Sequence, residues 1–109
     1  MQAKETIKKM IEANLKGGEK SLLVKVKPED SIAHISITDD IEDSVERIYK
    51  RIPEKYRDHV IGFKKCYYKD GSFCNFGLIF AEEYQKMFDA EMDAYYHDKA
   101  SWIARFGSN

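Results

Sequence analysis

Three side chains that can bind a divalent metal recur at helical spacing near the C-terminus. Asp89, Asp93 and His97 stand at positions i, i+4 and i+8, so an α-helix would place them along one face. Two carboxylates and an imidazole are suitable ligands for a divalent ion. The same spacing also arises on an ordinary solvated helix face, where Asp93 and His97 form a simple ion pair. The sequence offers a divalent-metal site on the C-terminal helix as an alternative function, and no metal as the main prediction.

The two cysteines and three histidines form no recognisable motif for nucleophilic catalysis. Cys66 or Cys74 can be combined with a distant histidine, but two cysteines and three histidines give several such pairs by chance. Gly17-Gly18 does not form a phosphate-binding loop, because it follows a predicted helix instead of opening one. The sequence therefore predicts a protein that is not an enzyme and holds no cofactor.

A third group of residues is suited to recognition and lies near the middle of the chain. Residues 60–68 and 73–80 have strand composition and flank Asp70-Gly71, a strong signal for a two-residue type I′ hairpin turn. This turn makes one face of the hairpin nearly all apolar, which assigns that face to the core. The opposite, outer face then carries four residues predicted to contact a partner: Lys64, Tyr68, Phe73 and Asn75.

An aromatic and basic sheet face fits two kinds of partner. Aromatic anchors among mixed charges are typical of protein interfaces, which makes a protein the expected partner. Aromatic rings on a sheet also stack the bases of single-stranded nucleic acid, and this is the second alternative. The predicted register places Tyr68 directly across from Phe73, a pair that by itself stabilises a hairpin by about 0.2–1 kcal/mol.

The same register predicts free cysteines. Cys66 would face Asn75 and Cys74 would face Tyr67, so the two thiols point to opposite faces and cannot form a disulfide. A three-residue loop would instead pair the two cysteines directly. Free thiols indicate a reducing compartment, and we expect a cytoplasmic protein.

Length and charge limit the remaining possibilities. A chain of 109 residues is expected to form a single domain over residues 1–109. Its net charge of −1 hides a segregation into basic segments (residues 1–29 and 55–69) and acidic segments (residues 30–54 and 70–109). This alternation argues against a uniformly basic nucleic-acid binder. No apolar run is long enough for a membrane span or a secretory signal, so no membrane partner is expected.

Acidic residues gather before and within the first turn of a helix predicted over residues 41–52. Asp39-Asp40 offers an N-cap, and acidic side chains in the first turn suit the positive end of the helix dipole. Such a cluster can also form the acidic rim of a binding surface. The predicted rim consists of Asp39, Asp40, Glu42 and Asp43.

The elements that must position these residues follow from hydrophobic periodicity. Helices are predicted over residues 3–16, over residues 41–52 and from residue 82, and strands over the ranges 21–27, 31–38, 60–68 and 73–80. The order α-β-β-α-β-β-α predicts an α+β fold. In it, two β-hairpins form an antiparallel four-stranded sheet with the helices packed on one face.

Aromatic residues near the C-terminus exceed what a small core obviously needs. Tyr95, Tyr96, Trp102 and Phe106 either cap the core or form the contact of a homodimer. Together these features predict a small, non-enzymatic protein-binding domain that acts by occupying a partner surface. Inhibitors and immunity-type proteins of phages and bacterial mobile elements are of this kind, an analogy of class without a sequence match.

Overall fold

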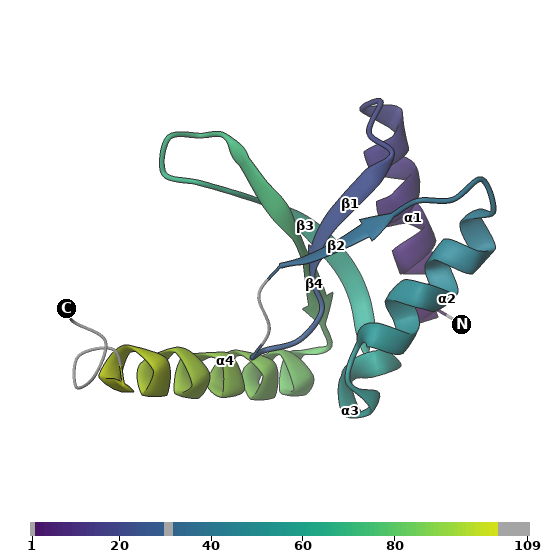
Figure 1. The fold of residues 1–109 in the computed structure, drawn as a ribbon. Helices are drawn as coiled ribbons and strands as arrows, with labels where there is room; N and C mark the ends of the chain where they lie inside the picture. Colours follow the sequence, from purple (N-terminus) through teal and green to yellow (C-terminus); the bar gives the residue numbers. More distant parts are fainter. Residues whose placement is uncertain (1, 30–31, 103–109) are drawn as a thin grey trace.

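The computed structural model of the protein describes residues 2–29 and 32–102 (Figure 1). Within them the chain forms the predicted α+β fold, in nearly the predicted order of elements, with one short helix added after Pro53. The strands are β1 (Ser21–Lys25), β2 (Ala33–Ser36), β3 (Val60–Tyr67) and β4 (Phe73–Phe80). The helices are α1 (Gln2–Lys16), α2 (Ile41–Arg51), α3 (Glu54–Arg57) and α4 (Glu82–Trp102).

The four-stranded sheet is mixed, whereas the sequence predicted a purely antiparallel one. The strand order is β2-β1-β4-β3, and both predicted hairpins, β1–β2 and β3–β4, form antiparallel pairs. The two hairpins join through β1 and β4, which run parallel with Val24 opposite Phe76. Both residues are buried, so the junction brings apolar parts of the two hairpins together in the centre of the sheet.

Helix α1 covers one face of the sheet and provides much of the core. Its buried stripe includes Ile7, Met10 and Ile11, which follow the helical spacing seen in the sequence. Helix α2 lies beside α1, and Asp40 caps its first turn by accepting a hydrogen bond from the backbone N–H of Asp43 at 3.3 Å. The predicted Asp39-Asp40 start of this helix is therefore confirmed.

Helix α4 leaves the end of β4 and runs away from α1 and α2 (Figure 1), whereas the prediction packed all helices on one face. Its first half is anchored by Phe88, whose ring lies 5.3 Å from that of Tyr56 and 4.9 Å from that of Phe80. Glu91 adds a hydrogen bond from the Tyr56 hydroxyl at 2.7 Å and an ion pair with Lys55. None of the helices in the described part of the chain is long and apolar enough to cross a membrane.

The β3–β4 hairpin closes with a three-residue loop instead of the predicted two-residue turn. The N–H of Tyr68 donates to Ser72 O at 2.8 Å, and the N–H of Gly71 donates to Tyr68 O at 2.9 Å. Gly71 has φ +90°, while no described residue other than glycine has positive φ, so Asp70 does not take the conformation of a type I′ turn. Asp70 instead accepts hydrogen bonds from the hydroxyl and N–H of Ser72, which lower its pKa.

A bulge next to the loop compensates for its extra residue. Tyr67 pairs with Phe73, and a register shift follows between Cys66 and Tyr67, so that Cys66 pairs with Asn75 as predicted. The loop and the bulge thus cancel over the rest of the hairpin up to Gly62, where a second shift occurs. Only the loop end and the base of the hairpin depart from the predicted register.

Candidate functional site

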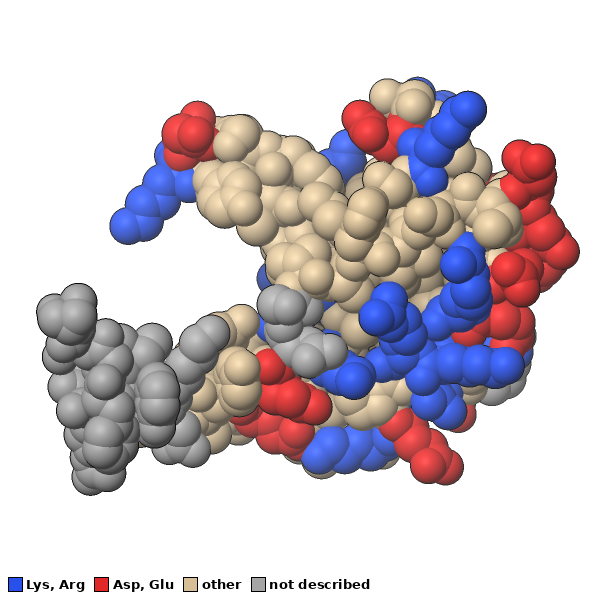
Figure 2. All heavy atoms as spheres, in the orientation of Figure 1, with Lys and Arg blue, Asp and Glu red and all other residues tan. Residues whose placement is uncertain are grey.

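Two of the predicted contact residues on the outer face, Lys64 and Asn75, line a groove of about 230 Å³ between the sheet and α4. We call it the hairpin–α4 groove. A hollow is visible there in Figure 2, between the hairpin and α4. The sheet wall of the groove is formed by Lys25, Lys64, Cys66, Asn75, Gly77 and Leu78, and the helix wall by Gln85, Phe88, Asp89 and Met92.

Phe73, the third predicted contact on this face, lies on the opposite side of the sheet. The bulge pairs it with Tyr67, and its ring lies 6.2 Å from the Tyr67 ring and 5.4 Å from the ring of buried Phe76. Phe73 also lines a second pocket together with Asn14 of α1. The predicted pair of Tyr68 and Phe73 is therefore wrong, because an extra residue between Phe73 and Asn75 turns the Phe73 side chain over.

Tyr68, the fourth predicted contact, stands at the end of the hairpin with 60% of its surface exposed. Its hydroxyl is hydrogen-bonded to Cys74, and this bond raises the pKa of Tyr68 above its usual value. On the helix side, Tyr96 is also exposed and accepts a hydrogen bond from Lys25 Nζ at 3.2 Å. The Lys25 ammonium lies 5.3 Å from the centre of the Tyr96 ring, close enough for a cation–π contact.

The centre of the groove is kept open by Gly77. A Cβ atom at this position would lie 3.3 Å from Cys66 Sγ and 3.4 Å from Lys64 Cε. These are tight contacts, so any side chain at position 77 would displace its two neighbours. Glycine therefore lets the side chains of Lys64 and Cys66 lie over the strand.

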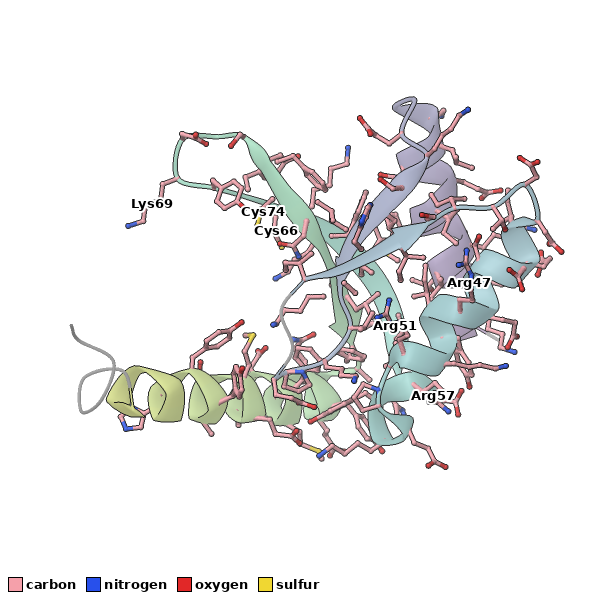
Figure 3. The ribbon with its side chains drawn as sticks, viewed as in Figure 1. Arg47, Arg51, Arg57, Cys66, Lys69 and Cys74 are labelled. Carbon is pink, nitrogen blue, oxygen red and sulfur yellow. The ribbon has the colours of Figure 1, made fainter. Side chains whose placement is uncertain are left out.

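Both cysteines are free thiols, as predicted, although the bulge removes the register on which that prediction rested for Cys74. Cys66 lies beside Gly77, while Cys74 is hydrogen-bonded to the Tyr68 hydroxyl. Figure 3 shows both cysteines on the hairpin, well away from Arg47 and Arg57.

The acidic residues at the start of α2 do not join the groove. They lie over the N-terminal end of α2, at the right of Figure 2, while the groove lies at the left. Three of them have structural partners: Asp40 caps the helix, Glu42 lies 3.3 Å from Lys8, and Asp43 lies 3.5 Å from Arg47. The fourth, Asp39, is exposed. The predicted acidic rim is thus a separate patch, largely used within the fold.

The candidate metal ligands on α4 do not converge. No three His, Cys, Asp or Glu side chains of the described residues are grouped so that they could hold a metal ion. Asp89 faces the hairpin–α4 groove and accepts a hydrogen bond from Gln85 at 3.0 Å, while Asp93 and His97 are exposed. The alternative of a metal site built from these three residues is therefore not supported.

Of the C-terminal aromatic residues, Tyr95 and Tyr96 are exposed and their rings meet edge to face at 5.2 Å. The Trp102 side chain and Phe106 lie outside the described residues. A homodimer through these residues stays a prediction.

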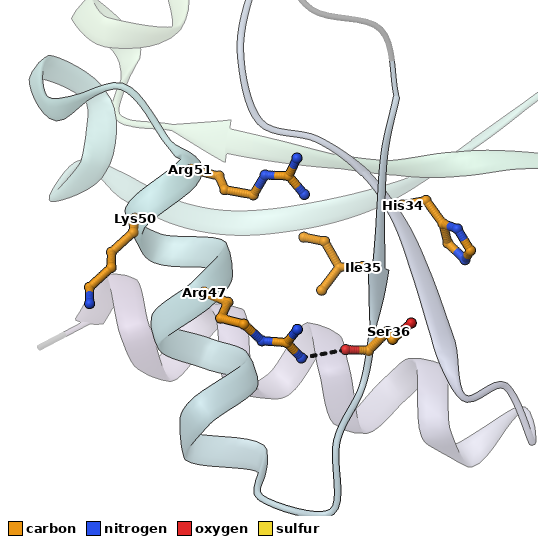
Figure 4. Close-up of a pocket in the computed structure, with 6 residues that line it drawn as sticks. All are labelled: His34, Ile35, Ser36, Arg47, Lys50 and Arg51. Atoms are coloured by element: carbon orange, nitrogen blue, oxygen red, sulfur yellow. Dashed lines mark hydrogen bonds between the residues drawn. The ribbon is translucent and has the colours of Figure 1, made fainter.

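A second opening lies between β2 and α2 and was missed in the sequence (Figure 4). It has a volume of about 490 Å³ and is lined by His34, Ile35, Ser36, Arg47, Lys50 and Arg51. We call it the β2–α2 pocket. Its basic residues belong to a segment with net negative charge, so a balance taken along the chain conceals them. The signal that was overlooked is the spacing of Arg47 and Arg51, which puts two arginines one helical turn apart.

Comparisons of the chain with protein-family models, with curated proteins and with solved structures found no match. The chemistry of the two openings is therefore the basis for a function.

Proposed function

We propose that the protein is a small, non-enzymatic protein-binding domain whose partner occupies the hairpin–α4 groove. The observation that carries the proposal is a pair of exposed tyrosines that flank the lining of the groove. Tyr68 stands at the loop end of the hairpin, and Tyr96 on α4 accepts a hydrogen bond from Lys25 of the groove. Tyrosine supplies a large contact area and a polar tip at a low entropic cost, which is why it is common in interfaces.

The size of the groove favours a protein over a small molecule. At about 230 Å³ it is smaller than the roughly 300–1,000 Å³ typical of cavities that enclose small ligands. A protein partner need not be enclosed, because it can extend from the groove onto the hairpin and α4. The groove is therefore better suited to receive part of a larger surface.

The charges of the groove also match the usual anatomy of an interface. Apolar atoms of Leu78, Phe88 and Met92 lie beside Lys64 and Asp89, which carry opposite charges. An apolar centre with mixed charges near it is typical of protein–protein contacts. Under this proposal the domain acts by occupying its partner's surface, as an inhibitor or immunity-type protein would.

The groove offers less support for the alternative of single-stranded nucleic acid. Base stacking on the outer face was expected from Tyr68 and Phe73 together, and Phe73 lies on the other side of the sheet. His59 does not provide a replacement, because its ring is stacked on Tyr84 at 3.5 Å. Binding of single-stranded nucleic acid is therefore the less favoured alternative, and the capture experiment below distinguishes it from a protein.

The test compares two neighbouring tyrosines of nearly equal exposure. Tyr68 is 60% exposed at the loop end of the hairpin, where strand alternation puts it on the same face as Lys64, whereas Tyr67 is 59% exposed on the α1 side. Immobilised wild-type protein would capture a partner from a lysate of the organism that carries the gene. The purified partner would then be titrated against Tyr68→Ala and Tyr67→Ala by calorimetry. We expect Tyr68→Ala to weaken binding by about 2 kcal/mol and Tyr67→Ala by less than about 0.5 kcal/mol.

Three results would contradict the proposal. Equal losses in the two variants would remove the groove from the interface, and a larger loss with Tyr67→Ala would move the interface to the α1 side. Capture of nuclease-sensitive material in place of a protein would favour nucleic acid. Thermal unfolding of both variants controls for loss of folded protein.

A further inference from the structure

β2 is an outer strand of the sheet, so one side of its backbone has no neighbouring strand in the described part of the chain. The N–H of Ile37 donates to Lys20 O at 2.9 Å. This hydrogen bond shows which residues of β2 direct their backbone N–H and C=O groups toward β1 and which direct them away. In an antiparallel pair, successive residues direct their backbone groups toward the partner strand and away from it in turn. Ile35 therefore faces β1, while His34 and Ser36 direct their N–H and C=O groups to the open side.

One of these outward groups already binds a guanidinium. Arg47 Nη2 donates to Ser36 O at 2.5 Å, from a helix that runs back beside β2 (Figure 4). The side chain of Arg51 also points toward β2, whereas that of Lys50 points away from it (Figure 4). Two guanidinium groups thus lie along the open side of the outer strand.

The spacing of the two arginines matches that of alternate side chains in a strand. Four residues of α-helix rise by about 6 Å, and two residues of a strand rise by about 6.6 Å. A strand added beside β2 would therefore present every second side chain at nearly the interval that separates Arg47 from Arg51. If those side chains were carboxylates, each would meet one guanidinium. Arg51 could bind its carboxylate with two hydrogen bonds, whereas Arg47 already contacts Ser36 O and Asp43 and has fewer N–H groups left to donate.

We propose that the β2–α2 pocket binds an extended acidic peptide segment of a partner protein, which adds to the sheet beside β2 and places alternate carboxylates against Arg47 and Arg51. Strand addition to an exposed sheet edge is a common mode of peptide recognition, in which the backbone supplies affinity and alternate side chains supply specificity. Arg51 is available for such a contact, because it forms no ion pair with any residue in the described part of the chain.

The lining favours a peptide over a nucleic acid. Proteins that bind single strands combine basic residues with aromatic rings on which the bases stack. No Phe, Tyr or Trp of the described residues lines this pocket, and the ring of His34 points away from it (Figure 4). The proposal does not rest on the hairpin–α4 groove, which is lined by β1, β3, β4 and α4 and shares no lining residue with this pocket.

The test uses two blocked synthetic peptides with the same composition. In the first, Glu alternates with Val and Thr; in the second, the Glu residues are gathered at one end. Fluorescence anisotropy measures their affinities for the full chain, and amide hydrogen exchange is followed by NMR. We expect the alternating peptide to bind more tightly and to slow the exchange of the His34 and Ser36 amides, because those groups become paired.

A variant of α2 and a control variant then test the contact at Arg51. Arg51→Gln should weaken the alternating peptide about tenfold, because a charge-assisted hydrogen bond is lost. Lys69→Gln removes the same charge from the exposed β3–β4 loop, far from Arg47 and Arg51 (Figure 3), so it should weaken binding less than about threefold. Thermal unfolding checks that each variant is folded. If a variant does not fold, the comparison of the two peptides on the wild-type protein still tests the proposal.

Each other outcome overturns the proposal. Equal binding of the two peptides, or unchanged exchange of His34 and Ser36, would show a general attraction between charges without strand pairing. Tighter binding of a single-stranded oligonucleotide or of inorganic polyphosphate would make the pocket a polyanion site. No binding at about millimolar peptide would mean that the arginines only protect the sheet edge from other strands.

Discussion

The hairpin–α4 groove and the β2–α2 pocket are built in opposite ways. The groove combines β1 with the much later β3–β4 hairpin and α4, so its shape depends on the pairing of β1 with β4 and on the docking of α4. The pocket is formed by β2 and α2, which follow one another directly in the chain. The groove should therefore be lost when α4 is released, while the pocket should persist. The comparison separates a site assembled by tertiary contacts from one assembled by neighbouring elements.

The largest expected effect comes from removing the anchor of α4. Phe88→Ala would delete a buried ring that contacts Tyr56 and Phe80, and we expect a loss of about 3–5 kcal/mol in the free energy of unfolding. Met87, its neighbour, is exposed, so Met87→Ala should cost less than about 0.5 kcal/mol. Urea unfolding measures both.

The same variants show whether the groove and the pocket are independent. Below the unfolding transition of Phe88→Ala, hydrogen exchange in α4 should become faster while the amides of α2 keep their protection. Unchanged protection of α4 would contradict the view that Phe88 anchors the helix. A parallel loss of protection in α2 would show that the two sites are not independent.

A smaller effect is expected at Glu91, and it depends on pH. Hydrogen bonds from Lys55 and Tyr56 lower the pKa of Glu91 below its usual value of 4.5. Its stabilising contribution is therefore complete above that value and is lost as the pH falls through the lowered pKa. Glu91→Gln should cost about 1 kcal/mol at about pH 7, because the carboxylate is partly exposed, and nearly nothing at about pH 2.

The control for this effect is Asp93→Asn, on the same helix but outside its first turn. Asp93 is exposed and forms no ion pair with any described residue, so the difference in stability between this variant and wild type should be small at every pH. Urea unfolding at several pH values gives the comparison. If the loss of unfolding free energy in Glu91→Gln does not change with pH, the ion pair with Lys55 does not contribute to the docking of α4.

The smallest effect on stability is expected at the centre of the groove. Gly77→Ala would press against Cys66 Sγ and Lys64 Cε, and both atoms belong to side chains that can move by a few tenths of an ångström, so we expect a cost below about 1 kcal/mol. Gly62→Ala is the matched control, because its Cβ would meet Ile79 at an ordinary 3.7 Å. Binding of the captured partner should weaken only with Gly77→Ala. Equal affinity for the two variants would show that the partner does not reach this part of the groove.

The positions of the helices and strands were predictable because they depend on local patterns. The buried stripe of Ile7, Met10 and Ile11 and the cap at Asp40 require only nearby residues and appear where they were expected. The Asp-Gly signal also located the hairpin correctly. It did not define the loop, because a three-residue loop with glycine at positive φ accepts the same residues as a type I′ turn.

The error in the loop explains the error in the candidate site. A strand alternates its side chains with a period of two, so one extra residue reverses every position between the loop and the compensating bulge. Phe73 lies in that interval and was assigned to the wrong face, whereas Lys64 and Asn75 lie beyond the bulge and were assigned to the groove side correctly. Nothing in the local sequence marks the bulge, because it depends on pairing between the two strands.

The sequence alone determined the α+β class, the two hairpins, the start of α2 and the side of the sheet on which Lys64 and Asn75 lie. Tertiary structure alone decided that β1 and β4 pair in parallel, that α4 runs away from α1, and that Arg47 and Arg51 lie along the open side of β2. The physical reason is the range of the interactions. Periodicity and capping act within a few residues, whereas strand order and the meeting of two surfaces depend on which buried faces fit together after the elements have formed.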